Sequence, residues 1–262
     1  MARLKNCRIK ALGLVAPAYL LLLIQIAPAS TIGPDVFGYT ATNAIYSYID
    51  ISATGTNVLA GLTDNFAGPI SLGFPFVFYG TTYTQVYLSS DGALTFTAGT
   101  ADFNNVDFQY WAPPGDMPMI APMWDSLSTP NGIYYQTIGS PGNEEFVYQF
   151  FDGAYCCNPV TPSLNFEAIL FQGTNRIEFQ YQNVVTGDPV NDYGNYATIG
   201  IRNTGGQANG SYLEWSFAQP VISNVEAIQF ADPPSSPLPE PASWLLAGSA
   251  LLYLGWKRLQ QS

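Results

Sequence analysis

Histidine is absent from all 262 residues of the chain, and its absence narrows the chemistry that the protein can perform. Neither a Ser-His-Asp or Cys-His catalytic arrangement nor a histidine-containing zinc site can be assembled without that residue. Most hydrolase mechanisms are therefore excluded. We predict a protein that is not an enzyme, with no catalytic residues, no cofactor and no metal.

Positive charge is also scarce. Of the 8 Lys and Arg residues, only Arg176 and Arg202 lie between residues 30 and 238, where 18 acidic residues give a formal charge of −16. A field of that sign repels nucleic acid and anionic headgroups and favours solubility. We expect no nucleic-acid partner. A solvated acidic surface is the favoured explanation, and attraction of cations or a basic partner is the alternative.

No window shows a long 3.6-residue apolar period, whereas Tyr, Phe, Val, Ile and Thr fill short runs. Such runs at this spacing predict an all-β fold, an antiparallel β-sandwich of roughly a dozen strands. The expected strands are residues 45–51, 70–78, 85–89, 93–97, 120–124, 132–138, 145–151, 164–171, 176–184, 197–202, 212–217 and 227–230.

Two tight turns support the antiparallel arrangement. Asp91-Gly92 lies between the third and fourth expected strands and is a hairpin signal. The turn at residues 172–175 contains Gly and Asn, which tolerate the positive φ of tight hairpins. No internal repeat is present, which disfavours a propeller or a solenoid.

The N-terminus has the pattern of a secretory signal peptide. An apolar stretch, residues 11–26, leads to the cleavage pattern Ala27-Pro28-Ala29. It is preceded by the positive charges Arg3, Lys5, Arg8 and Lys10. We predict that residues 1–29 are a signal helix that signal peptidase removes before Ser30, and an uncleaved anchor is the alternative.

The C-terminus has three parts in a fixed order, Pro239-Glu240-Pro241, the apolar residues 242–256, and Lys257-Arg258. The 15 apolar residues would form a helix of about 22 Å, shorter than the ~30 Å apolar core of a bilayer. We therefore expect a short, transient transmembrane helix with its charges on the cytoplasmic side. Residues 232–238 are a Pro-rich spacer.

This order resembles the PEP-CTERM sorting signal. The resemblance implies that an exosortase recognises residues 239–262 and removes the tail during export, in the envelope of a Gram-negative-type bacterium. It also implies an association with exopolysaccharide or a biofilm matrix.

The central region has a second resemblance, to nidogen-like domains and related secreted bacterial sandwich modules. Its motifs are rich in aromatic, Pro and Gly residues and lie at residues 74–80, 89–92, 120–125, 165–170 and 176–181. The resemblance implies that residues 30–231 form an extracellular β-sandwich domain with an adhesion or matrix role.

An alternative function is a carbohydrate-active enzyme, because a carboxylate pair performs glycoside hydrolysis without histidine. The candidate acids are Glu144, Glu145, Glu167, Glu178 and Glu214. Glu167 and Glu178 fall on neighbouring expected strands. Alternation on a solvent-exposed face explains them as well.

Two loops carry several oxygen ligands suited to calcium, residues 102–107 and residues 188–192. Neither fits an EF-hand. Because Asn and Asp also favour turns, we prefer the structural explanation.

The adjacent Cys156 and Cys157 leave three states open. Neighbouring α-carbons are about 3.8 Å apart, closer than the usual 4.4 to 6.8 Å of a disulfide, so a bond between them would be strained. A bond to another chain and two thiols are the other states, and an oxidising exterior disfavours the thiols.

Aromatic residues in or beside loops are the best sequence indication of a ligand. They are Tyr110, Trp111, Tyr134, Tyr135, Tyr155, Tyr193 and Tyr196. Flat rings flanked by Asn, Gln and Asp suit sugar stacking, although many such rings serve packing. We therefore expect an exported, exosortase-processed surface or matrix protein that binds extracellular polysaccharide, and self-association is the alternative.

Overall fold

The structure is a computed structural model, and it describes residues 31–109, 116–156 and 163–231. Several predicted features lie outside the described residues. These are the signal peptide with its cleavage site at Ala27, Ala29 and Ser30, the spacer 232–238, the sorting signal with Pro239, Glu240, Pro241, Lys257 and Arg258, and the residues Tyr110, Trp111 and Cys157.

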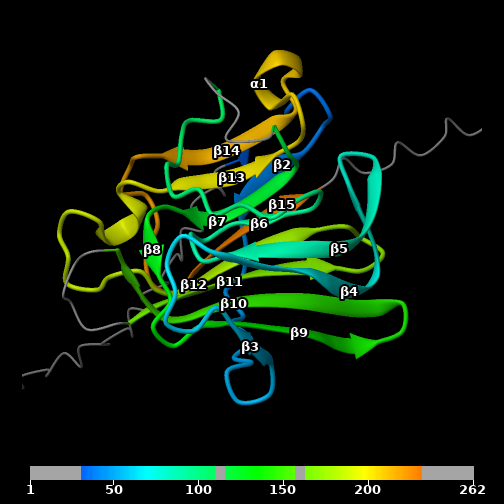
Figure 1. The fold of residues 1–262 in the computed structure, drawn as a ribbon. Coiled ribbons are helices and arrows are strands. Elements are labelled where there is room, and N and C mark those ends of the chain that lie inside the picture. Colours follow the sequence, from blue (N-terminus) through cyan, green and yellow to red (C-terminus); the bar gives the residue numbers. More distant parts are fainter. Residues whose placement is uncertain (1–30, 110–115, 157–162, 232–262) are drawn as a thin grey trace, which may run out of the picture.

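Fifteen strands and two short helices follow one another in the described chain (Figure 1). They are β1 (Thr31–Ile32), β2 (Thr40–Asn43), β3 (Thr56–Val58), β4 (Phe66–Phe78), β5 (Thr81–Ser89), β6 (Leu94–Thr95), β7 (Met119–Trp124), β8 (Leu127–Ser128), β9 (Ile133–Ser140), β10 (Asn143–Tyr155), β11 (Leu164–Phe171), β12 (Ile177–Asn183), η1 (Asp192–Gly194), β13 (Thr198–Arg202), α1 (Gly206–Asn209), β14 (Tyr212–Phe217) and β15 (Glu226–Ala231).

The strands form two antiparallel sheets in a sandwich-like arrangement. One sheet has nine strands in the order β1-β2-β15-β12-β11-β10-β9-β3, with β8 paired to β10, and the other has six in the order β14-β13-β7-β6-β5-β4. The predicted all-β, antiparallel class is therefore confirmed. No helix in residues 31–109, 116–156 or 163–231 is long and apolar enough to cross a membrane.

Both predicted hairpins are present. β5 pairs with β6 across the Asp91-Gly92 turn, and β11 pairs with β12 across residues 172–175. A Cβ on Gly92, at φ 74°, would lie 1.9 Å from the Met123 carbonyl oxygen, so no other residue fits there without a backbone shift. Asn175 adopts φ 53°, as the turn composition predicts.

The main core lies between the two sheets and is dominated by aromatic and branched side chains. Alternation places every second residue of β4 inside, for example Leu72, Phe74, Phe76 and Phe78. Two smaller apolar clusters lie on the outer faces of the sheets. Each outer face is therefore partly covered by a segment that is not a strand.

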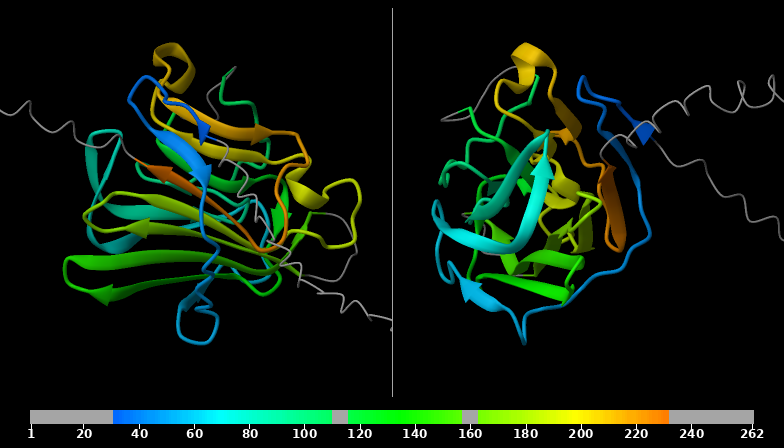
Figure 2. Two further views of the ribbon diagram at one scale, coloured as in Figure 1. Left: turned by 180° about the vertical axis from the view of Figure 1, so that it is seen from behind. Right: turned by 90° about the vertical axis from the view of Figure 1, so that its right-hand side faces the viewer.

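The first covering segment corrects a sequence prediction. Residues 45–51 were expected to form a strand, but they form none, and Figure 2 shows this part of the blue segment passing along the outside of the nine-stranded sheet. We call residues 45–51 the strap. Ile51 packs there against Val147 and Ile169. Alternate residues of the strap do face the sheet, but the strap runs across the strands and forms no backbone pairing with any of them.

The backbone of the strap is hydrogen-bonded to side chains of the sheet, where a strand would be hydrogen-bonded to the backbone of its neighbour. The backbone N–H groups of Ser47, Ile49 and Ile51 donate to side-chain oxygens of Gln180, Glu167 and Gln149, respectively, each at 2.9 Å. These three acceptors face one another across β12, β11 and β10 in the sheet register. A row of polar side chains thus satisfies the backbone of a crossing segment.

The loop before β7 covers the outer face of the six-stranded sheet. Phe108 is fully buried and stacks on Trp124, with ring centroids 6.3 Å apart. The Trp124 indole N–H donates to the Asp102 carbonyl oxygen at 2.7 Å. Two residues of this loop, Asp107 and Gln109, also line a groove beside β14.

Candidate functional site

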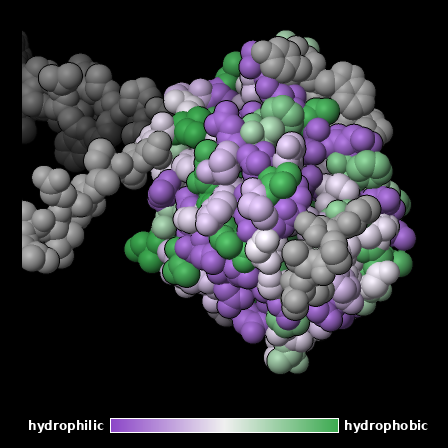
Figure 3. Space-filling model, turned by 90° about the vertical axis from the view of Figure 1, so that its left-hand side faces the viewer, coloured by the Kyte–Doolittle hydropathy of each residue, from purple (hydrophilic) through white to green (hydrophobic). Residues whose placement is uncertain are grey.

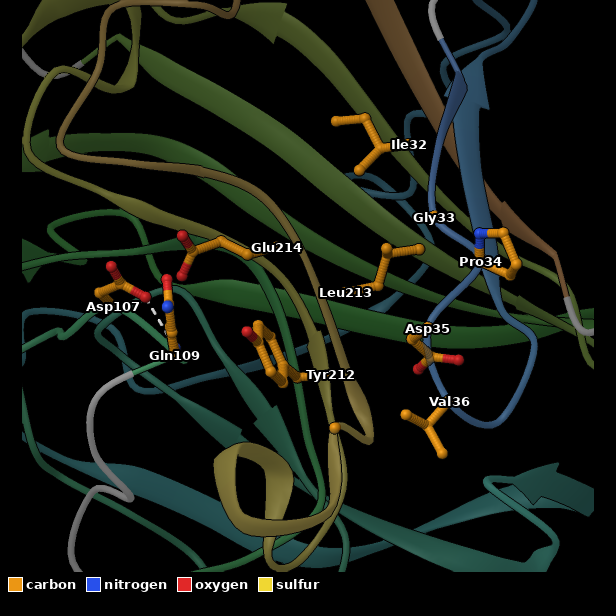
Figure 4. A pocket seen from close by; sticks show the side chains of 11 residues that line it. Ile32, Gly33, Pro34, Asp35, Val36, Asp107, Gln109, Tyr212, Leu213 and Glu214 are labelled. Atoms are coloured by element: carbon orange, nitrogen blue, oxygen red, sulfur yellow. Dashed lines mark hydrogen bonds between the residues drawn. The ribbon is translucent and has the colours of Figure 1, made fainter.

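A groove of about 470 Å³ lies beside β14, at the edge of the six-stranded sheet. We call it the β14 groove. It is lined by Ile32, Gly33, Pro34, Asp35, Val36, Asp107, Gln109, Gly210, Tyr212, Leu213 and Glu214. Figure 4 shows Tyr212 between a polar wall, with Asp107, Gln109 and Glu214, and an apolar wall, with Pro34, Val36 and Leu213.

The apolar wall is built by the turn that follows β1. Asp35 holds this turn, because its Oδ1 accepts the N–H groups of Gly38 and Tyr39 at 2.7 and 2.9 Å. Its Oδ2 accepts the Tyr79 hydroxyl at 2.8 Å. The Val36 N–H donates to the Gly210 carbonyl at 3.2 Å, which fixes the turn beside β14. Val36 itself is 77% exposed.

The polar wall is built where the covering loop meets β14. Glu214 Oε2 accepts the Phe108 N–H at 2.8 Å, and burial of the Phe108 ring fixes that amide in place. Asp107 Oδ1 accepts the Gln109 N–H at 2.7 Å. Each carboxylate therefore has one oxygen engaged with the loop backbone. The polar side chains Asp107, Gln109 and Glu214 therefore lie together on one wall of the groove.

Burial raises the pKa of Glu214 to about 7, the Phe108 N–H opposes the rise, and the neighbouring Asp107 carboxylate adds to it. Glu214 therefore exists as a mixture of its two protonation states near neutral pH. The two carboxyl groups accept the N–H groups of adjacent residues, Phe108 and Gln109, so they lie in the same part of the groove. Such a pair in a hollow is a candidate functional site.

The two acids that the sequence places on neighbouring strands do not form an open catalytic pair. Glu167 and Glu178 share the outer face of the nine-stranded sheet, but the strap covers Glu167, which is 0% exposed. Burial is the main cause that raises the pKa of Glu167 to about 9. Glu178 forms an ion pair with Arg176 at 3.3 Å. A substrate does not reach Glu167.

Two smaller hollows lie near Arg176, with volumes of about 240 and 160 Å³. Glu145 lines both of them, and Glu144 lines the smaller. The Arg176 guanidinium lies 3.9 Å from the centre of the Phe171 ring and is also paired with Glu178. Its charge is thus already compensated, so these hollows offer less to a ligand than the β14 groove.

The loops considered for calcium use their oxygens within the protein. Asp102 Oδ1 accepts both the backbone and side-chain N–H groups of Asn104, and Asp192 accepts N–H and hydroxyl donors from Thr186. Asp188 accepts from Val190 and Asn191. Across residues 31–109, 116–156 and 163–231, no three acidic or cysteine side chains are grouped as a metal site.

Most of the described candidate stacking rings serve packing. Tyr155 is the last residue of β10, beside a loop as expected, but it is 2% exposed and so offers no ring surface to a ligand. Tyr134 meets Phe151 edge to face, and Tyr135 stacks on Phe146. Tyr193 and Tyr196 are 45% and 50% exposed, respectively, but they lie outside the β14 groove.

Exposed apolar side chains are dispersed. On the face shown in Figure 3, hydrophilic and hydrophobic residues are interspersed. Single exposed apolar residues are normal on soluble domains and carry no functional argument.

Cys156 is half-buried after β10, and its backbone N–H donates to the Ser126 carbonyl at 2.8 Å. Because Cys157 lies outside the described residues, the state of the cysteine pair stays a prediction.

The architecture and the groove can now be compared with known proteins. A family model described as NIDO related matches residues 38–237. The chain belongs to the NIDO-related family. This NIDO-related region supports the nidogen-like resemblance of the central motifs and an extracellular or secreted β-sandwich module. No curated protein and no solved structure has a significant match to the chain.

Sequence reasoning missed the groove of this NIDO-related domain. Asp107 and Glu214 were noted separately, one as a calcium ligand and the other as a general acid, whereas Tyr212 and the turn after β1 carried no signal. The walls come from segments more than 170 residues apart in the chain. The turn after β1 and the loop before β7 meet at β14 only when the two sheets pack and these segments dock beside it.

Proposed function

We propose that this NIDO-related protein is an exported surface or extracellular-matrix component, not an enzyme, that holds polysaccharide in the β14 groove. The lining of the groove carries the proposal. A tyrosine ring and an apolar wall suit the apolar face of a sugar ring, and the opposite wall supplies carboxylates and an amide for hydroxyl groups. The turn held by Asp35 gives the site a preformed wall.

The route to the surface is part of the same proposal. The signal-peptide pattern supports export, and the order of Pro239-Glu240-Pro241, an apolar run and Lys257-Arg258 supports processing by an exosortase after transient insertion in the membrane. The family supports an extracellular place for the domain. Binding of polysaccharide in the β14 groove would then associate the exported protein with exopolysaccharide or a biofilm matrix.

Binding of the full chain to polysaccharide from the surface of the producing cells tests the proposal. Tyr212→Ala removes the ring at the centre of the groove, and we expect binding to weaken about tenfold or more. Tyr196→Ala removes an exposed ring elsewhere and should leave binding unchanged. Melting curves check that both variants fold. If Tyr196→Ala loses binding instead, the glycan site lies at the η1 loop.

One observation favours a second candidate, a carbohydrate-active enzyme. The groove brings Asp107 and Glu214 together, and a pKa of about 7 suits Glu214 for general acid catalysis. The same experiment separates the two functions. Polysaccharide bound without release of oligosaccharides supports the binding module, whereas release that Glu214→Gln abolishes supports the enzyme. If the protein neither binds polysaccharide nor releases oligosaccharides, self-association remains as its function.

A further inference from the structure

The charge of the β14 groove is one-sided. Its lining contains the carboxyl groups of Asp35, Asp107 and Glu214, and no lysine or arginine. The nearby Arg202 is 1% exposed and forms an ion pair with Asp116 at 2.8 Å. Its guanidinium lies over the Phe108 ring, on the buried side of the polar wall. The groove therefore attracts cationic groups and disfavours anionic ones.

Three acceptors on the polar wall remain available. Asp107 Oδ2, Glu214 Oε1 and the side-chain oxygen of Gln109 have no hydrogen-bond partner in the described part of the chain. Figure 4 shows these three side chains on the same side of Tyr212. An ammonium group has three N–H donors and no acceptor. Three acceptors, two of them on carboxylates, match that donor set.

We infer that the β14 groove selects a polysaccharide with free amino groups, that is, one containing unacetylated hexosamine, over neutral and uronic-acid polymers. The inference rests on the proposed function and names its ligand class. The sugar ring lies on Tyr212 and the apolar wall, and its ammonium group lies against Asp107, Gln109 and Glu214. A uronate at the same place would meet two carboxylates.

The protonation of Glu214 agrees with this geometry. Proximity to Asp107 contributes to the raised pKa of Glu214, because two ionised carboxyl groups repel each other. An ammonium ion beside both groups favours their ionised forms. Ligand binding thus offsets a repulsion that exists in the unoccupied groove.

The test compares three oligosaccharides of equal length on the full chain: a glucosamine oligomer, its N-acetylated counterpart and an oligogalacturonate. We expect the glucosamine oligomer to bind most tightly. Asp107→Asn and Glu214→Gln each keep an acceptor for the loop N–H and remove one charge. Each should weaken glucosamine binding about tenfold, the usual range for a hydrogen bond to a charged group.

Glu144→Gln is the matched control, since it removes one negative charge from a half-buried site in a different hollow. It should change binding less than about twofold, because Glu144 does not line the β14 groove and salt screens a charge in another hollow. Equal weakening by Glu144→Gln would overturn the inference in favour of bulk attraction by the acidic domain. Tighter binding of the oligogalacturonate or of the acetylated oligomer would also overturn it.

The same binding measurements distinguish a wrong amine preference from a wrong proposed function. Preferential binding of the acetylated oligomer that Tyr212→Ala abolishes would refute the amine preference and retain the polysaccharide site. Absence of binding to every oligosaccharide and to the producer's own polysaccharide would refute both.

Discussion

Single acidic residues in this protein act as acceptors for backbone N–H groups of covering segments. Glu214 does so for Phe108 at 2.8 Å, and Glu167 does so for Ile49 at 2.9 Å. Glu167 Oε2 has no hydrogen-bond partner in the described ranges. Burial, assisted by the charges of Asp50, Glu178 and Glu145, raises the pKa of Glu167 to about 9, so this carboxyl is neutral at pH 7.

Replacement of Glu167 by Gln tests its neutral state. The folded pKa of about 9 exceeds the ordinary value of 4.5, so the folded chain retains a proton that the unfolded chain releases. The contribution of Glu167 is therefore present below pH 4.5 and is lost as the pH rises toward 9. In urea unfolding, Glu167→Gln should be close to the wild type near pH 5 and exceed its stability by about 5 kcal/mol at pH 9, since each unit of pKa shift corresponds to about 1.4 kcal/mol.

The Glu167→Gln variant should still lose some stability as the pH rises from about 4 to 7, because two other buried acids ionise with raised pKa values. Burial also raises the pKa of Asp91 to about 7 and that of Asp125 to about 6. The stability difference between Glu167→Gln and the wild type isolates Glu167 at every pH, because Asp91 and Asp125 are present in both proteins, and it should grow steadily from pH 5 to pH 9. Glu144→Gln, at a half-buried site, serves as the control. An unchanged gap between Glu167→Gln and the wild type from pH 5 to 9 would contradict the assignment.

Among the elements, the strap shows how a β-type sequence forms something other than a strand. Its alternate residues behave as strand residues do, since Ser47, Ile49 and Ile51 donate their N–H groups toward the sheet. The acceptors are side chains on three neighbouring strands. A segment can cross a sheet in this way only where several polar side chains stand in one register row.

Amide hydrogen exchange should reveal this pattern. We expect slow exchange at Ser47, Ile49 and Ile51. We expect fast exchange at Tyr46, Tyr48 and Asp50, whose N–H groups have no bonded acceptor in the described structure.

Gln180→Leu removes one acceptor and should speed the exchange of Ser47 while that of Ile51 remains slow. NMR of the labelled protein measures both amides in one sample, so Ile51 is an internal control. Uniform protection along residues 46–51 would instead indicate pairing with a backbone partner.

At the scale of the whole molecule, the first and last strands of the described domain, β1 and β15, both pair with β2. β2 pairs with β15, with Thr40 opposite Ala231, and β1 pairs with β2. The β14 groove lies beside the N-terminal end of the described domain, because Ile32 of β1 and the turn that follows it contribute to the groove lining.

Intact mass of the exported protein tests the processing. We expect a chain that begins at Ser30 and lacks Trp256 and Arg258 if, as proposed, signal peptidase and an exosortase remove the two ends. Replacing Pro239-Glu240-Pro241 with three alanines should retain the C-terminal tail without altering the N-terminus. A wild-type protein from the cell surface that still contains Arg258 would refute exosortase processing.

The sequence by itself determined the all-β, antiparallel class and the turns at Asp91-Gly92 and residues 172–175. These follow from local patterns, since alternation and positive-φ turn residues act between neighbours in the chain. Local patterns also misled at residues 45–51, where alternation is the same for a strand and for the strap. Composition further disfavoured histidine-based chemistry, although it did not identify a site.

The tertiary structure alone decided where the strap lies and what lines the β14 groove. Gln149, Glu167 and Gln180 become acceptors for the strap because their strands are in register, and Asp107 meets Glu214 because a covering loop docks on the six-stranded sheet. Contacts between residues about 100 apart depend on the packing of the whole sandwich. No local pattern contains them, which is why the fold class was predictable and the groove was not.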